Sequence, residues 1–229
     1  MNPILLLHGA LGTREQLVPI ESALQQSGYT TMSLNFSGHG QQPFSQHGFH
    51  VDVFAEEIMS FLNHHDLSFV DVFGYSMGGY VALTAAAQWP ARFRKIVTLG
   101  TKFDWSPVVA QAEVQKLDPE KILTKIPQFA DLLKQLHGDS HWKLLLEATA
   151  NMMSKLGSRP TLDENTLGAI QQEVLVLAGD KDNMAPANVA EQVAQQIPFG
   201  SFQQLPNTPH PIERVNLEAL MPLLRNFFV

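Results

Sequence analysis

A serine set between two glycines marks the part of the chain best suited to covalent chemistry. Residues 70–83 read VDVFGYSMGGYVAL, which places Ser76 in a G-x-S-x-G motif. The β-prone run before the motif and the alanine-rich pattern after it predict a strand, a sharp turn and a helix. Glycine at 74 and 78 suits a turn whose strained backbone leaves no room for side chains. The pattern predicts a nucleophilic hydroxyl beside the N–H groups of a helix N-terminus.

A serine hydroxyl becomes an effective nucleophile when a base takes its proton and a third group orients that base. G-x-S-x-G also occurs in ordinary glycine-rich turns, so these partners decide the interpretation. The strand-like run 173–179 leads into Asp180 and Asp182, and the run 201–205 leads into His210. Because the carboxyl ends of parallel strands share one edge of a sheet, the loops after these runs can converge on the serine.

His210 is the candidate base among the nine histidines of the chain. Pro209 and Pro211 flank it and stiffen the loop that carries it. His8 and His39 are expected to form structural hydrogen bonds in two earlier loops. The chain has no cysteine and no H-E-x-x-H motif, so the sequence predicts no metal, zinc included, and no cofactor.

Five short motifs follow one another along the chain. They are the His8-Gly9 pair, a G-H-G segment at 38–40, the serine turn at 74–79, a G-x-x-D turn at 179–182 and the loop of His210. In this order they resemble the α/β-hydrolase superfamily, and within it the small single-domain serine hydrolases of carboxylesterase type. The resemblance implies an α/β-hydrolase fold, a nucleophile elbow at the serine and a catalytic triad.

The resemblance assigns the acid of the triad to Asp182, the last residue of the G-x-x-D turn. Asp180 would then be a solvated or turn-capping carboxylate. Asp104 is the alternative acid, because it follows the strand-like run 96–100, after which some members of the superfamily carry theirs. Whichever acid is used would hold His210 in the reactive tautomer.

Attack by the serine places negative charge on a substrate oxygen, which two backbone N–H groups can stabilise. Met77 supplies one of them, because it is the first residue after the serine. The resemblance implies that Ala10, directly after the H-G pair, supplies the second, with Leu11 as the alternative donor.

Strand-like and helical patterns alternate along the chain, which predicts a doubly wound, mostly parallel sheet of six strands. The expected strands lie near 3–8, 31–36, 69–75, 94–100, 173–179 and 201–205. The expected helices lie near 14–27, 50–64, 77–88, 186–197 and 212–228. The antiparallel strands that lead the superfamily's sheet are not expected here, because the H-G motif begins at His8.

The segment 103–167 differs from the rest, because its pattern is helical without strands. Pro119 and Pro127 begin two helices, while residues 139–140 and Gly157 are interpreted as the caps of a third. The segment resembles the superfamily's helical cap, inserted within a single domain that spans 1–229. The residues expected to line the substrate pocket are Leu11, Phe103, Trp105, Trp142 and Met153.

Length and charge narrow the classes of partner. The chain of 229 residues is long enough to bury one core. Its net charge of −7 argues against nucleic acid and anionic membranes as partners. No apolar run reaches the ~18 residues of a membrane span, and the chain opens without a signal-peptide pattern. We therefore expect a cytoplasmic monomer or dimer.

The expected function is hydrolysis of a small neutral ester or thioester through an acyl-enzyme, with no cofactor. Cleavage of a carbon–carbon bond, or the reaction of the menaquinone-pathway synthase, is an alternative. Residues 74–79 resemble the synthase's turn, although it commonly continues with arginine where this chain has Tyr80. A ligand sensor on the same fold, which binds without turnover, is the alternative from another class.

Overall fold

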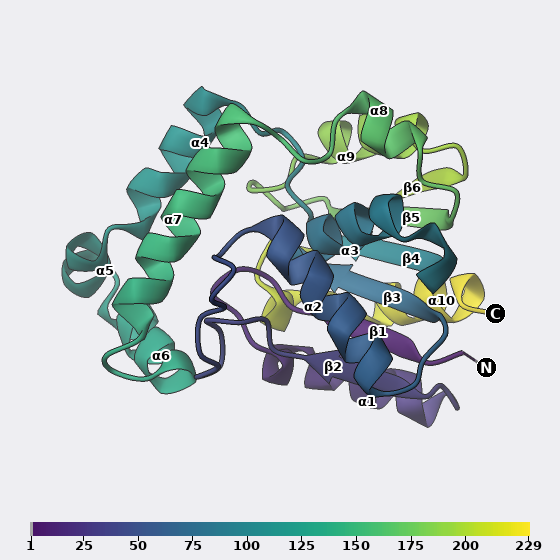
Figure 1. The fold of residues 1–229 in the computed structure, drawn as a ribbon, viewed down its shortest axis with the longest axis horizontal. Coiled ribbons are helices and arrows are strands. Elements are labelled where there is room, and N and C mark those ends of the chain that lie inside the picture. Colours follow the sequence, from purple (N-terminus) through teal and green to yellow (C-terminus); the bar gives the residue numbers. More distant parts are fainter. Residues whose placement is uncertain (1) are drawn as a thin grey trace.

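The computed structural model describes residues 2–229, which form one sheet of six parallel strands (Figure 1). The strands are β1 (Ile4–Leu7), β2 (Thr31–Leu34), β3 (Val70–Tyr75), β4 (Phe93–Leu99), β5 (Glu173–Gly179) and β6 (Gly200–Leu205). Their order across the sheet is β2-β1-β3-β4-β5-β6. The predicted fold class is confirmed, and each strand end lies within two residues of its predicted position.

Alternate side chains of the strands enter two apolar cores, one on each face of the sheet. In β1, Leu5 and Leu7 belong to the larger core, whereas Ile4 and Leu6 belong to the smaller one. Burial on both faces explains why this strand is a continuous apolar run rather than an alternating one. The larger core is covered by α2 (Val51–His64), α3 (Met77–Gln88) and α9 (Ala187–Gln196), and the smaller by α1 (Val18–Gln26) and α10 (Leu217–Phe227).

Two of the predicted helices are shorter than the patterns suggested, because each begins with a separate 3₁₀ turn. The first turn spans Arg14–Leu17 and runs directly into α1. The second spans Ile212–Arg214, and α10 starts afresh after it. Asn216 caps α10 by accepting a hydrogen bond from the N–H of Ala219 at 3.2 Å.

The strand order reverses at β1, and this reversal locates the site. The chain runs from β1 outward to β2 and then returns to form β3 on the opposite side of β1. Leu7, the last residue of β1, pairs with Gly74 near the end of β3. The loops that leave β1 and β3 therefore diverge at a switch point, where open α/β sheets bind their ligands.

Between β4 and β5 the chain forms five α-helices, four of which stand to one side of the sheet (Figure 1). These four, called the inserted helices below, are α4 (Pro107–Val114), α5 (Pro119–Lys125), α6 (Pro127–His137) and α7 (Trp142–Ser158). The fifth is α8 (Glu164–Gly168). Ile122, Leu133, Trp142 and Leu146 form a small core among the inserted helices. Within residues 2–229, no helix is both long and apolar enough to cross a membrane.

Helix α4 was not predicted, although its start carries a recognisable signal. The Ser106 hydroxyl accepts a hydrogen bond from the N–H of Val109 at 3.2 Å, and Pro107 occupies the first turn. Serine followed by proline is a typical helix N-terminus. The signal precedes only eight helical residues, so the apolar periodicity that marks a longer helix is absent.

The ends predicted for the third inserted helix are wrong. Helix α7 begins at Trp142 with no side-chain cap, so residues 139–140 do not cap it. Gly157 lies within α7 rather than beyond its end. Gly157 allows α4 and α7 to approach each other closely, because a side chain at position 157 would overlap Ala110 of α4.

Candidate active site

The strand–turn–helix around Ser76 holds the serine in a strained conformation. Ser76 has φ 52° and ψ −117° and stands at the junction of β3 and α3. A Cβ on Gly74 would come within 2.5 Å of the Gly79 backbone, and one on Gly78 would overlap the Leu7 carbonyl. Glycine is therefore required at both predicted positions for the turn to close.

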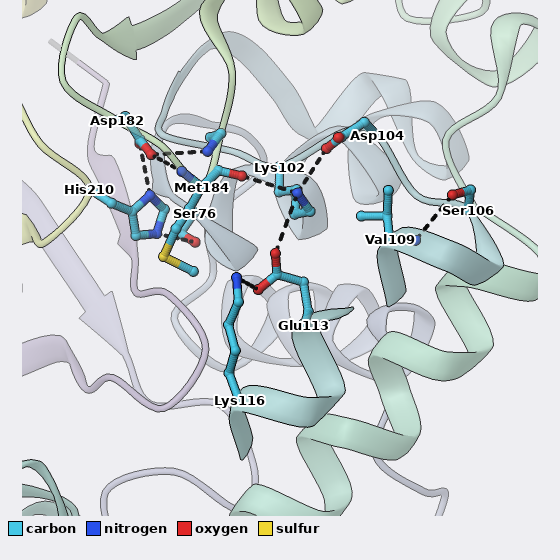
Figure 2. Close-up of polar contacts among 11 residues, drawn as sticks. Ser76, Lys102, Asp104, Ser106, Val109, Glu113, Lys116, Asp182, Met184 and His210 are labelled. Carbon is cyan, nitrogen blue, oxygen red and sulfur yellow. Dashed lines mark hydrogen bonds and ion pairs between the residues drawn. The ribbon is translucent and has the colours of Figure 1, made fainter. Parts of the chain in front are cut away.

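His210 joins Ser76 to Asp182 through its two ring nitrogens (Figure 2). Nε2 lies 3.3 Å from the Ser76 hydroxyl, and Nδ1 lies 2.8 Å from Oδ2 of Asp182. The three residues follow β3, β5 and β6, whose carboxyl ends lie on the same edge of the sheet. This arrangement can relay a proton from the hydroxyl to the imidazole and stabilise the resulting cation.

The two other candidate acids have different partners. Asp180 accepts a hydrogen bond from the N–H of Thr208 at 3.0 Å, so it fixes the turn that precedes the histidine loop. Asp104 forms an ion pair with Lys102 at 3.1 Å. Neither carboxylate contacts His210 among the hydrogen bonds of residues 2–229.

The Asp182 carboxylate is buried and fully engaged. Its Oδ1 accepts hydrogen bonds from the N–H groups of Met184 at 2.8 Å and Ala185 at 2.9 Å. Burial raises the pKa of Asp182, but the contact with His210 and these two N–H donors outweigh it, so the pKa lies below its ordinary value. The carboxylate is therefore ionised and can orient the imidazole.

The backbone of His210 is fixed by Tyr75, the residue directly before the serine. The Tyr75 hydroxyl donates a hydrogen bond to the His210 carbonyl at 2.7 Å. Burial raises the pKa of Tyr75 above its ordinary value, so the hydroxyl keeps its proton and remains a donor. Nothing in the sequence pattern indicated this role, because the two residues are brought together only by the fold.

The loop after β1 aims the N–H of Ala10. His8 accepts a hydrogen bond at Nε2 from the N–H of Phe36, so its proton lies on Nδ1, which donates to the Gly9 carbonyl at 2.8 Å. The N–H of Gly12 donates to the same carbonyl at 3.1 Å. Because the C=O and N–H of one trans peptide point in opposite directions, the Ala10 N–H is fixed in the direction away from these donors.

Burial lowers the pKa of His8 to about 4, so the imidazole is neutral and keeps this pattern of one acceptor and one donor. The sequence-based expectation that His8 forms structural hydrogen bonds agrees with its contacts. Both candidate oxyanion residues, Ala10 and Met77, border the same cavity as the serine hydroxyl.

A small cavity of about 60 Å³ lies beside Ser76 and His210. Its wall is mostly apolar and includes four of the eight methionines of the chain. Besides Ser76 and His210, the residues that line the cavity are Ala10, Val51, Met77, Tyr80, Lys102, Trp105, Glu113, Met152, Met153, Leu156 and Met184. A volume of this size holds a few water molecules or a short acyl group.

The residues predicted to line the pocket separate into two groups. Trp105 and Met153 border the cavity. Trp142 does not, because its indole is buried in the small core among the inserted helices. Leu11 packs against that same core, and Phe103 packs beside Tyr80 with ring centroids 6.3 Å apart. These three side chains pack against other residues and do not line the cavity.

A second, larger groove of about 1150 Å³ runs along α2, α3 and α7. It shares Val51, Met152 and Leu156 with the wall of the smaller cavity. None of the three candidate triad residues lines this groove, whereas Ser76 and His210 border the smaller cavity. Across residues 2–229, no group of three or more His, Cys, Asp or Glu side chains is arranged to hold a metal ion.

The chain is similar to known proteins over most of its length. A family model described as an alpha/beta hydrolase fold matches residues 2–132. In sequence the chain is 22% identical to the sn-1-specific diacylglycerol lipase ABHD11 of Danio rerio, over 91% of this chain and 73% of that protein. In structure it is similar to a thermophilic esterase from Thermogutta terrifontis, with a TM-score of 0.79, 20% identity and coverage of 100% and 89% of the two chains. It is also similar to 2-hydroxy-6-oxo-6-phenylhexa-2,4-dienoate hydrolase (BphD) from Rhodococcus sp. strain RHA1, with a TM-score of 0.81, 20% identity and coverage of 99% and 90%.

Proposed function

Because the chain belongs to the α/β-hydrolase family, we propose that it is a serine hydrolase that cleaves a small neutral carboxylic ester or thioester. The observation that carries the proposal is the continuous line of contacts from Ser76 through His210 to Asp182. The similarity to a protein named as a lipase and the fold shared with an esterase support the same reaction class.

In this mechanism the Ser76 hydroxyl attacks the substrate carbonyl while Nε2 of His210 takes its proton. Asp182 holds the imidazole in the tautomer that presents Nε2 and stabilises the imidazolium. His210 then protonates the leaving alcohol or thiol, which departs and leaves an acyl group on Ser76. Water activated by the same imidazole releases the acid and restores the hydroxyl.

The N–H groups of Ala10 and Met77 stabilise the oxyanion of the tetrahedral intermediate. Met77 is the first residue of α3, so its N–H has no partner within the helix and the helix dipole adds to its effect. The contacts of His8 and Gly12 with the Gly9 carbonyl set the opposing Ala10 N–H in place before substrate arrives.

The acyl group is short and uncharged in this proposal. The methionine side chains of the wall can adapt to acyl groups of different shape. The cavity volume of about 60 Å³ nevertheless limits the length of the acyl group. A buried, unpaired carboxylate on the substrate would carry a large desolvation cost. The segment 103–167, which supplies Trp105 and Met153, acts here as a cap that closes the acyl side of the site.

Hydrolysis of a carbon–carbon bond is the second candidate reaction. Similarity of fold to the dienoate hydrolase favours it. A dienoate carries a carboxylate, and the one cationic side chain in the cavity wall, Lys102, already faces two carboxylates. The charge balance of the wall therefore favours the neutral ester.

The test combines covalent labelling with turnover. A fluorophosphonate probe followed by peptide mapping is expected to modify Ser76, and neutral p-nitrophenyl esters of two to four carbons are expected to turn over many times. Acyl-CoA thioesters and a dienoate are assayed in parallel to rank the leaving groups. Labelling at another residue refutes the assigned nucleophile, and release of a single equivalent of product indicates a ligand sensor instead.

A further inference from the structure

Lys102 is a largely buried cation between the acid loop and the inserted helices (Figure 2). Its side chain is 15% exposed and follows β4 by three residues. The ammonium lies 3.1 Å from the Met184 carbonyl, 3.1 Å from Oδ1 of Asp104 and 3.7 Å from Oε1 of Glu113. The ammonium therefore donates one hydrogen bond, to the Met184 carbonyl, and its charge is balanced by two carboxylates.

The contact with Met184 reaches the candidate catalytic acid through a single peptide group. The carbonyl of Met184 and the N–H of Ala185 belong to the same peptide unit. The carbonyl accepts from Lys102, while the N–H donates to Oδ1 of Asp182 at 2.9 Å. A cation on the carbonyl polarises the peptide and strengthens the hydrogen bond at its other end.

The other partners of Lys102 connect this peptide to α4. Glu113 lies on α4, borders the cavity and is only 10% exposed in its side chain. Lys116 holds the second oxygen of Glu113 at 2.9 Å from the solvent side, where its own side chain is 58% exposed. The four charges cancel, but apolar residues in place of the whole cluster would avoid the cost of burying charges beside a mostly apolar cavity. The retention of a charge here calls for a role beyond stability.

We infer that Lys102 is a positioning residue for the triad. It holds the turn of residues 182–185 so that Asp182 keeps its two N–H donors and its contact with His210, and it links this geometry to the position of α4. Among the hydrogen bonds and ion pairs of residues 2–229, none joins Lys102 to Ser76 or His210, so we assign its effect to the Met184–Ala185 peptide. The inference rests on the proposed serine mechanism.

The test compares Lys102→Met with Lys116→Met, which removes the other lysine that pairs with Glu113. We expect Lys102→Met to lower kcat for p-nitrophenyl acetate by roughly 10- to 100-fold, with KM changed less than about threefold, because the base is misaligned rather than the substrate released. Lys116→Met keeps the wild-type kcat within about twofold. Lys102→Arg restores part of the rate, since the charge and a donor to the Met184 carbonyl are retained.

Thermal unfolding checks that each variant is folded. If Lys102→Met does not fold, Lys102→Gln is compared with Lys116→Gln, because the glutamine amide still donates to the Met184 carbonyl without the charge. A folded variant at position 102 with the wild-type kcat overturns the inference, and so does an equal loss on replacing Lys116. Fluorophosphonate labelling distinguishes failure of the serine mechanism from failure of the role of Lys102. If Ser76 is not labelled in the wild type, the serine mechanism itself is contradicted. If Ser76 is labelled in the wild type and the Lys102 variant is unaffected, only the role of Lys102 is contradicted.

Discussion

The loops at the carboxyl edge of the sheet and the inserted helices border one cavity by different means. At the sheet edge, hydrogen bonds of 2.7–2.9 Å hold the His210 carbonyl, the Asp182 carboxylate and the Gly9 carbonyl. The inserted helices contribute mainly packing, as with Met152 and Met153 of α7. The reactive atoms are thus fixed by directional contacts, while the space around them is set by flexible side chains. Chemistry and substrate size are therefore expected to respond to different substitutions.

The largest expected effect is on the sheet side. Replacement of Ser76 by alanine removes the hydroxyl that faces His210 Nε2, so turnover of a short p-nitrophenyl ester is expected to fall by about 10⁵- to 10⁶-fold. Steady-state kinetics and the thermal midpoint are measured together, and the midpoint should not fall. Retention of more than one per cent of the rate in the folded variant would show that another nucleophile is used.

The next effect distinguishes the three candidate acids. Asp182→Asn is expected to lower kcat by about 10³- to 10⁴-fold, because an amide favours the wrong imidazole tautomer and cannot stabilise the cation. Asp180→Asn and Asp104→Asn are the matched controls, since both carboxylates contact other groups. Their kcat should stay within about tenfold of the wild type. A larger loss for Asp104→Asn would move the acid to the loop after β4.

A smaller effect concerns stability where the two regions meet. His8 and His39 belong to loops of the sheet, and His137 ends α6. The ring centroid of His39 lies 4.9 Å from that of His8 and 6.1 Å from that of His137. Burial lowers the pKa of all three, that of His8 to about 4. The unfolded chain takes up these protons near pH ~6.5, so acidification favours unfolding between about pH 6.5 and 4. His8 alone accounts for about 3 kcal/mol of lost unfolding free energy at the lower end.

Urea unfolding at pH 7, 6, 5 and 4.5 measures this effect. The midpoint should fall steadily through the window, and His8→Gln should reduce the dependence on pH although it lowers the stability at pH 7. His64→Asn, at the exposed end of α2, is the control and should leave the slope unchanged. A wild-type midpoint that is equal at pH 7 and 4.5 would mean that the folded state accommodates the protonated rings.

The smallest expected effect is on the helical side and alters preference rather than rate. Met153→Ala enlarges the cavity, so kcat/KM for acyl chains one or two carbons longer should rise by about 3- to 10-fold relative to acetate. Trp142→Ala is the matched control, because the indole lies in the core of the inserted helices. It should lower the unfolding free energy by about 3–5 kcal/mol without moving the chain-length optimum. A shift of that optimum in the tryptophan variant would break the distinction between wall and support.

The sequence predicted the sheet edge well, because each of its features is local. Gly74, Ser76 and Gly78 specify one turn by sterics, and buried parallel strands such as β1 and β5 are continuous apolar runs. His210 was indicated by a loop with proline on both sides. Once the strand order follows the usual right-handed crossovers, the ends of these strands meet without further information.

The inserted helices were less predictable, because what matters there is tertiary. The spacing of apolar residues indicated that Trp142 and Met153 share a helix but could not tell which of them faces the sheet. Likewise, Lys102 and Glu113 are ordinary charged residues in the sequence. The contact of Lys102 with the Met184 carbonyl and its ion pair with Glu113 depend on how the acid loop and α4 lie against the end of β4, which no local pattern encodes.

The close approach of Gly157 to Ala110 has a mechanical consequence. Helices α4 and α7 touch there with only the Ala110 methyl group between their backbones, and packing this tight favours movement of the two helices as a unit. A displacement of α7 that widens the cavity at Met153 must therefore also carry Glu113 away from Lys102. Lengthening this ion pair costs electrostatic energy, which opposes the displacement. The space available to an acyl group is therefore coupled to the distance between Lys102 and Glu113.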